Sequence, residues 1–275
     1  MSRMPSIFRL FAWLALSTMI RGDDWPHFLG PSMDTTWREE GVRTRFPEAG
    51  MPLDWEHPLG GGYSGPSVVG GKVFVMDRLA KPYEPGKVQG NPNFIRAEIP
   101  GQERVMAFDV TTGDLLWEHR YEAPYTTVYL YAIGPRCTPT VSAEQLYALG
   151  AEGHLHCLKA STGEVLWARH LPADYGVAVP EWGYAAHPLV VGDQVICMVG
   201  GDGSTVVSLD RHTGEERWRS LSSDKPGYCP PSQVTLGGRQ QVLVWHGEAL
   251  AGLNPSNGRP FWRVDAKPLY GMSIG

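Results

Sequence analysis

The stretch LHCLKASTGEVLW, residues 155–167, decides the fold because the chain repeats its pattern three more times. In each copy an apolar segment leads to a Thr-Gly or Asn-Gly turn, and a tryptophan follows four residues after the glycine. Successive tryptophans stand 50, 51 and 44 residues apart, which is typical of stacked or radially repeated units. The repeated glycines and tryptophans are Gly113, Trp117, Gly163, Trp167, Gly214, Trp218, Gly258 and Trp262.

The third copy indicates what one repeat contains. Short apolar strands are predicted at residues 187–191, 194–199 and 205–210, and a fourth at 216–219, with glycine-rich turns between them. Four short antiparallel strands in about fifty residues are the content of one propeller blade. The sequence therefore predicts an all-β fold, a β-propeller of about four four-stranded antiparallel blades plus a stub, as an incomplete part of a seven- or eight-bladed ring.

The residues that recur in the repeat, namely the turn glycine, the Asp or Asn before it and the tryptophan after it, have physical reasons. Glycine in the turn supplies a positive φ, and Asp109, Asp210 and Asn254 are expected to accept hydrogen bonds from turn amides. The tryptophans are expected to pack between blades rather than to stack on a ligand, because each buries a large apolar area. Cys157 occupies an inward position that a small residue fills in the other repeats, and Cys137 and Cys229 belong to non-adjacent repeats. The four cysteines are therefore interpreted as packing residues without a disulfide.

Three regions are expected along the chain. Residues 1–22 combine Arg3 and Arg9 with an apolar run and are interpreted as a signal peptide, or alternatively as an anchor. Residues 23–52 form a lead-in segment, and residues 53–275 form the partial propeller. Residues 53–57 copy the fourth strand of a blade but precede the first blade, and 267–275 resemble the start of another. We therefore expect a truncated product, whose open blade face would favour self-association.

Several functions are excluded or left without support. A net charge of −5 argues against a nucleic-acid partner, and no segment after the signal is long enough to span a membrane. No zinc, phosphate-loop or nucleophile-elbow motif is present, so no catalytic residue and no metal site is assigned. His154 and His156 share a strand face and could chelate a metal, although surface histidines are the favoured interpretation.

Aromatic residues next to the first strands give the candidate binding site. Before each of these first strands, except that of the second blade, a tyrosine follows a glycine or a leucine. This ring of tyrosines could bind a peptide or a flat ligand at the channel mouth. Alternatively, each tyrosine packs against its own loop. The loops at residues 79–104 and 121–136 are expected on the same face. Glu181 could form an acid–base pair with His187 there. The candidate binding residues are Tyr63, Tyr184, Tyr228, Tyr270, Trp182 and His187.

The repeat resembles that of pyrroloquinoline-quinone (PQQ)-type propellers over residues 53–275. The segment DWPHFLGP, residues 24–31, is similar to the lead-in of exported PQQ-like propellers, which are related to the propeller subunit of the outer-membrane β-barrel assembly machinery. A resemblance to the quinoprotein dehydrogenases of this type would imply a bound quinone beside a calcium ion. For the alcohol enzymes, it would also imply a disulfide between adjacent cysteines. This sequence has no adjacent cysteines and no calcium-loop spacing.

We therefore expect an exported, non-catalytic scaffold in the periplasm or cell envelope that binds a protein or peptide partner without a cofactor. The alternative is a PQQ-dependent alcohol or sugar dehydrogenase, or a degenerate relative, which would use PQQ with calcium.

Overall fold

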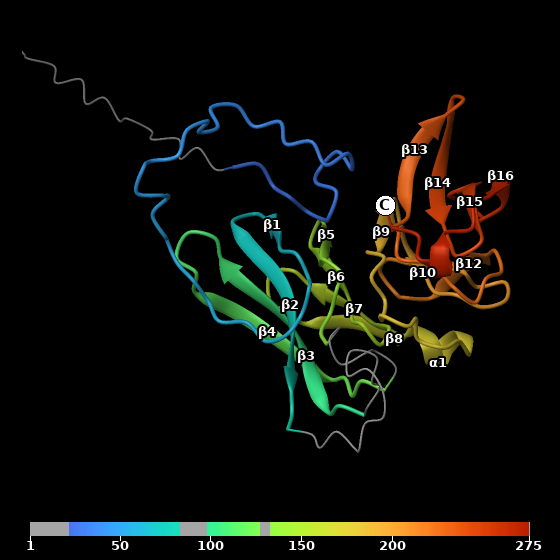
Figure 1. The fold of residues 1–275 in the computed structure, drawn as a ribbon, viewed down its shortest axis with the longest axis horizontal. Helices are drawn as coiled ribbons and strands as arrows, with labels where there is room; N and C mark the ends of the chain where they lie inside the picture. The colour runs from blue at the N-terminus through green and yellow to red at the C-terminus, as the bar shows by residue number, and fades with distance from the viewer. Residues whose placement is uncertain (1–21, 83–97, 127–132, 275) are drawn as a thin grey trace, which may run out of the picture.

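The structure is a computed structural model that describes residues 22–82, 98–126 and 133–274. Within them the chain forms four four-stranded antiparallel sheets, which confirms the predicted blades (Figure 1). Blade 1 contains β1 (Ser67–Val69), β2 (Lys72–Ala80), β3 (Gly101–Asp109) and β4 (Leu115–Glu122). Blade 2 contains β5 (Thr140–Ser142), β6 (Gln145–Leu149), β7 (His154–Lys159) and β8 (Val165–His170). Blade 3 contains β9 (Leu189–Val191), β10 (Gln194–Met198), β11 (Val206–Asp210) and β12 (Glu216–Ser220). Blade 4 contains β13 (Ser232–Leu236), β14 (Arg239–Trp245), β15 (Ala249–Leu253) and β16 (Pro260–Asp265).

The hydrophobic core lies between consecutive blades. One cluster joins blades 1 and 2, a second joins blades 2 and 3, and a third joins blades 3 and 4. The short first strands β1, β5 and β9 contact one another in turn, so they form the inner side of the arc. The fourth strands carry the tryptophans at the outer side, as the sequence predicts.

The glycine turns and the tryptophans form one repeated lock between blades. Gly113, Gly163, Gly214 and Gly258 all have φ between 70° and 74°. The indole of Trp117 lies against Gly163, that of Trp167 against Gly214, and that of Trp218 against Gly258. Each indole N–H also donates to a carbonyl in the turn that it covers, at Ala160 (3.1 Å), Arg211 (2.9 Å) and Pro255 (3.0 Å) respectively. The predicted role of these residues in packing between blades is confirmed.

Trp55 repeats the lock without a strand. Its ring covers Gly113 and its N–H donates to the carbonyl of Val110 at 3.0 Å, as an outer tryptophan does in the other blades. Residues 53–57 were predicted as a fourth strand, but in the described part of the chain they form no strand. Trp262 lies on β16 and donates to Gln241 of its own blade at 2.7 Å. The predicted self-association stays a prediction.

The lead-in segment runs along the inner side of the arc, past β1 and β5 (Figure 1). Trp25 exchanges two backbone hydrogen bonds with Val68 of β1, and the carbonyl of Pro26 accepts one from Val141 of β5. Phe28 stacks on His187, just before β9, with ring centroids 4.4 Å apart. The segment therefore contacts the inner ends of blades 1, 2 and 3 in turn.

Some features of the structure differ from the sequence prediction, and some predicted segments lie outside the described residues. Strand β2 extends to Ala80 and β3 begins at Gly101, so the two ends of the predicted loop at 79–104 are sheet, and residues 83–97 lie outside the described part. A short helix, α1 (Leu171–Tyr175), and a 3-10 turn, η3 (Leu269–Gly271), were not predicted. The predicted signal peptide falls almost wholly outside the described residues. No helix within the described ranges is long and apolar enough to cross a membrane.

Candidate functional site

The four predicted tyrosines do not form one ring of equivalent residues. Tyr63 and Tyr270 are 57% and 69% exposed, Tyr228 is half-buried, and Tyr184 is only 2% exposed. Tyr270 also has a φ of 58°, a left-handed conformation that is uncommon for a bulky side chain. The tyrosines therefore divide into a buried member, Tyr184, and three members that reach the surface.

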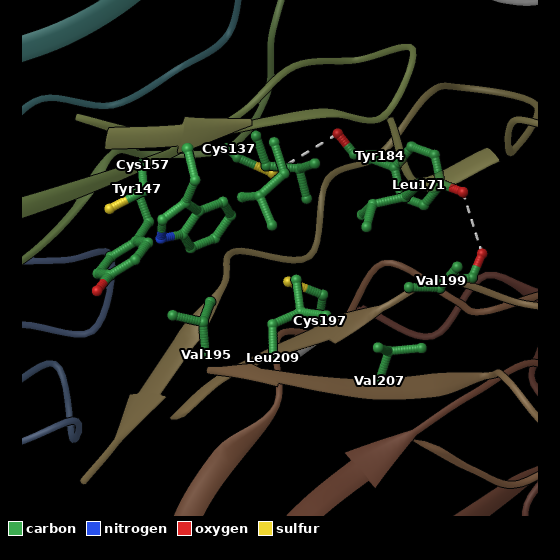
Figure 2. Packing of buried hydrophobic residues seen from close by; sticks show 13 residues of the cluster. Cys137, Tyr147, Cys157, Leu171, Tyr184, Val195, Cys197, Val199, Val207 and Leu209 are labelled. Carbon is green, nitrogen blue, oxygen red and sulfur yellow. Dashed lines mark hydrogen bonds between the residues drawn. The ribbon is translucent and has the colours of Figure 1, made fainter. Parts of the chain in front are cut away.

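Tyr184 belongs to the core between blades 2 and 3, and its prediction as a binding residue is wrong. Its hydroxyl donates to the carbonyl of Val199 at 3.1 Å, and its own carbonyl accepts from the thiol of Cys137 (Figure 2). Its ring lies among apolar side chains of both blades. The alternative interpretation, that the tyrosine packs in place, holds here because its only polar atom has a buried acceptor.

Three other predicted residues meet at one cavity of about 440 Å³. Trp182 and Tyr228 line it with edge-to-face rings whose centroids are 6.1 Å apart. The amide of Trp182 donates to the Tyr228 hydroxyl at 3.4 Å, so the two loops are tied together. His187 and Phe28 line the same cavity. Most of the remaining lining is apolar, from Ala185, Pro230, Met272 and Ile274.

His187 is held as a neutral ring. The amide of Thr138 donates to its Nδ1 at 2.7 Å, which leaves the proton on Nε2. Burial, with a smaller contribution from His27, lowers the pKa of His187 to about 4. Nδ1 is therefore engaged and the ring does not take up a proton near neutral pH. The sequence hypothesis of an acid–base pair with Glu181 gains no support from this geometry, because the base nitrogen is already used.

Arg136 is the one charged side chain among the residues that line this cavity. Its guanidinium carbon lies 4.6 Å from the centre of the Tyr63 ring, in cation–π geometry. Among the described residues, its buried Nε has no hydrogen-bond partner. Sequence reasoning placed Arg136 only at the end of a loop. The Tyr63 ring that it covers was itself a candidate, and that contact between blades could not be read from the sequence.

A second cavity of about 310 Å³ adjoins the same aromatic pair. It shares Trp182 and Tyr228 with the first cavity and is also lined by Tyr270 and Lys225. The Lys225 ammonium donates to the carbonyl of Tyr270 at 3.0 Å, which fixes the backbone beside that exposed ring. The predicted residues Trp182, Tyr228 and Tyr270 are thus brought together at this cavity, whereas Tyr63 contacts Arg136 on the wall of the first cavity.

The histidines interpreted as surface residues lie between blades 1 and 2, so that interpretation is wrong for His156, which is 8% exposed. The ring of His156 contacts Tyr121 and His119 of β4, with centroids 4.2 and 5.0 Å away. His154 stacks on His170 with centroids 4.3 Å apart. Within the described residues, no group of three His, Cys, Asp or Glu side chains is arranged to hold a metal ion. The proposed chelate is therefore not supported.

These rings should make the protein sensitive to acid. Burial lowers the pKa of His156 to about 3 and that of His154 to about 4, from an ordinary value of 6.5. As the pH falls below about 7, these histidines take up protons in the unfolded chain but stay neutral in the folded one. Their contribution to the free energy of unfolding is therefore fully present above about pH 7 and is lost as the pH drops. From pH 7 to pH 4.5 we expect His156 alone to lower the free energy of unfolding by about 2–3 kcal/mol.

Urea denaturation of the full chain at a series of pH values measures this slope. His156→Phe should flatten it, because phenylalanine fills the same space without titrating. The matched control His212→Phe changes a ring with a 62% exposed side chain and should leave the slope unchanged. Equal slopes in wild type and His156→Phe would contradict the assignment.

A buried acidic group in blade 1 was missed from the sequence. Glu103 of β3 is fully buried, and it accepts hydrogen bonds from the hydroxyls of Tyr121 and Tyr125 and from the amide of Ala151 at 3.0 Å. Burial raises the pKa of its carboxyl. The alternation of Glu103, Val105 and Ala107 along β3 was the available signal, because it places all three on the same inward face. Tyr121 and Tyr125 were predicted on an open loop, and both serve this buried network instead.

The comparisons with known proteins agree with the repeat. A family model described as outer membrane protein assembly factor BamB matches residues 101–268. Over 147 residues the chain is 30% identical to the outer membrane protein assembly factor BamB of Kangiella koreensis. The aligned region covers 52% of this chain and 34% of that protein. The chain thus spans about a third of that relative's length.

Solved structures show the same fold at low sequence identity. A quinohemoprotein alcohol dehydrogenase from Comamonas testosteroni is similar with a TM-score of 0.59 and 15% identity, over 89% of this chain and 41% of that one. A europium-containing methanol dehydrogenase is similar with a TM-score of 0.50 and 16% identity, over 79% and 44%. These likenesses concern the propeller fold alone. Because the family match covers more than half of the chain and includes all four copies of the repeat, the chain belongs to the PQQ-like propeller family described as outer membrane protein assembly factor BamB.

Proposed function

We propose that this chain is a non-catalytic binding module of the cell envelope, and that it holds a protein partner at the loops around Trp182 and Tyr228. The observation that carries the proposal is the pair of cavities that share these two rings, next to the exposed Tyr270. Aromatic side chains in partly desolvated cavities are the usual anchors of protein interfaces. The apolar run in residues 1–22 and the relatives in outer-membrane assembly support an exported location.

A role without a quinone is part of this proposal. The dehydrogenases that share the fold imply PQQ beside a calcium ion, and PQQ carries several carboxylates that need cationic partners. The 440 Å³ cavity offers one guanidinium, a neutral His187 and apolar rings, and no described group of acidic side chains is arranged for a metal. These residues do not fit that cofactor, so no step is assigned to it.

Site-directed photo-crosslinking in the native cells tests the proposed face. A photoreactive amino acid at Tyr270 should yield a discrete crosslinked protein band, because this side chain projects from the rim of the second cavity. The same amino acid at Thr111, on an exposed turn at the outer end of blade 1, is the matched control and should yield none. Equal crosslinking at both positions, or none at Tyr270, would argue against this face. Sustained dye-coupled alcohol oxidation after addition of PQQ and Ca²⁺ would overturn the non-catalytic role.

A further inference from the structure

We infer that the cavity beside Arg136 takes the C-terminal residue of a partner chain, an apolar residue that ends in a free carboxylate. This inference rests on the proposed function and names the chemistry that the binding face recognises. It is carried by one juxtaposition: an apolar aromatic cavity with a single charged group on its wall.

The first step concerns the apolar part of the ligand. The rings of Phe28, Trp182 and Tyr228 and the side chain of Ile274 surround the cavity, and its volume of about 440 Å³ falls within the range of small-ligand sites. Ile274 is 70% exposed and Phe28 is 45% exposed, so apolar surface is open to water at the mouth. A bulky apolar side chain that enters this cavity would cover that surface, with a gain of roughly 25 cal/mol per Å².

The second step concerns the charge. Arg136 lines the cavity, and its guanidinium is oriented by the Tyr63 ring. A carboxylate is the acceptor that a guanidinium binds best, with two parallel hydrogen bonds. No acidic side chain lines the cavity among the described residues. The ligand therefore has to bring the negative charge itself.

The third step distinguishes a chain end from an internal acidic residue. In an extended peptide, neighbouring side chains point to opposite faces, and the next residue on the same face lies about 6.6 Å further along. An internal Asp or Glu next to an apolar residue would thus point away from the cavity. A C-terminal residue carries its side chain and its carboxylate on the same Cα, which matches an apolar cavity and a guanidinium on one wall. The second cavity, which shares Trp182 and Tyr228 with the first, gives room for the preceding residues.

Fluorescence anisotropy with the full chain and dye-labelled hexapeptides tests the inference. One peptide ends in Leu with a free carboxylate, a second is the same peptide with a C-terminal amide, and a third is amidated with Asp before the final Leu. The free acid should bind about tenfold to a hundredfold more tightly than either amide, because the guanidinium–carboxylate pair is lost in both. Equal affinity of acid and amide would overturn the inference, and tighter binding of the internal Asp peptide would replace the chain end with an acidic side chain.

Two variants separate the charge from the cavity. Arg136→Met keeps the length of the stem and should make acid and amide bind equally, whereas the matched control Arg259→Met, at an exposed turn, should preserve the difference. Ala185→Trp fills the apolar part and should abolish binding of every peptide. If Arg136→Met fails to fold, judged by its thermal midpoint, the wild-type comparison and Ala185→Trp still decide the matter.

The failures of the two proposals can be told apart. If no peptide binds at millimolar concentration while the photoreactive residue at Tyr270 still captures its partner, the binding face stands and the chain-end ligand is wrong. If neither experiment gives a signal, both proposals are wrong.

Discussion

Replacing Trp167 with alanine should lower the free energy of unfolding by about 3–5 kcal/mol, the usual cost of deleting a buried aromatic side chain. The indole is 8% exposed between blades 2 and 3, and its N–H donates to the carbonyl of Arg211 at 2.9 Å. The same carbonyl accepts from Gln145 and Tyr147, so the turn loses one of several donors as well as the ring. Urea denaturation followed by far-UV circular dichroism measures the change.

The control for this prediction is Trp37→Ala, which removes an identical side chain that is 58% exposed in the lead-in segment. Its effect should stay within about 0.5 kcal/mol. The complementary variant Gly214→Ala tests the other half of the lock, because the added Cβ would come 2.8 Å from the Trp167 ring at a residue with φ of 73°. A loss of less than about 1 kcal/mol in Trp167→Ala would contradict the idea that the locks hold the blades together.

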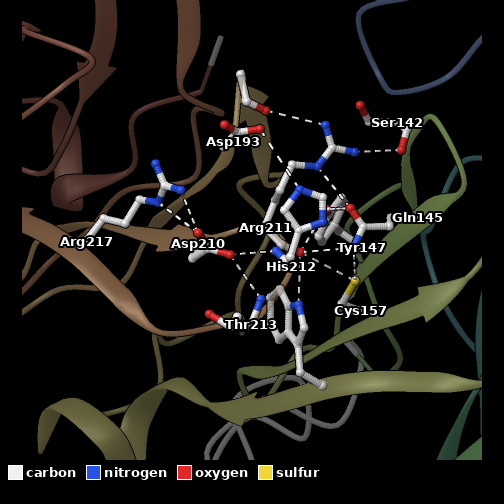
Figure 3. Close-up of polar contacts among 12 residues, drawn as sticks. Ser142, Gln145, Tyr147, Cys157, Asp193, Asp210, Arg211, His212, Thr213 and Arg217 are labelled. Carbon is white, nitrogen blue, oxygen red and sulfur yellow. Dashed lines mark hydrogen bonds and ion pairs between the residues drawn. The ribbon is translucent and has the colours of Figure 1, made fainter.

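The fold could be predicted from the repeat because all residues of the lock within one blade are close together in sequence. Glycine at positive φ, the Asp or Asn that accepts turn amides, and the tryptophan four residues later all lie within one hairpin. The structure confirms the caps as well. Asp210 accepts from the amides of His212 and Thr213 (Figure 3). Asn254 accepts from the amide of Ser256. Such short-range patterns depend on turn geometry, which few residue types satisfy.

The candidate site could be predicted only in part, because its contacts join loops from different blades. Tyr184 and Tyr228 both follow a glycine, yet Tyr184 is buried by the neighbouring blade while Tyr228 lines a cavity. Nothing within the local sequence distinguishes them. Trp182, Tyr228 and His187 were placed correctly near one another, whereas the stacking of Phe28 on His187 depends on the path of the lead-in segment. The long-range path of a segment without regular structure leaves no periodic signal.

Buried polar groups were missed for a related reason. A charged residue in a strand is normally expected at the surface, since burial of an unpaired charge is unfavourable. Glu103 is tolerated because hydroxyl and amide donors from β4, the following loop and blade 2 converge on it. Those donors are 18, 22 and 48 residues away in sequence, so no pattern within β3 identifies them. The same network explains why Gly150 has no side chain, because a Cβ there would collide with the Glu103 carboxylate.

Substitution of Glu103 should therefore show whether this network stabilises the contact between blades 1 and 2. Glu103→Ala leaves the hydroxyls of Tyr121 and Tyr125 and the amide of Ala151 without their acceptor, at about 1–3 kcal/mol for each group that water cannot reach. We expect a total loss of about 3–5 kcal/mol in the free energy of unfolding, measured by urea denaturation at pH 7.

Glu103→Gln distinguishes the missing acceptor from the missing charge. The amide oxygen can still accept from Tyr125 and Ala151, and its NH₂ group can donate to the Tyr121 hydroxyl, so the loss should be only about 1–2 kcal/mol. The control Glu122→Ala, whose side chain is 60% exposed, should change stability by less than about 0.5 kcal/mol. If Glu103→Gln proved as damaging as Glu103→Ala, the negative charge itself would be the stabilising element, and the nearby buried Arg78 would be its partner, because Arg78 lowers the pKa of Glu103 against the effect of burial.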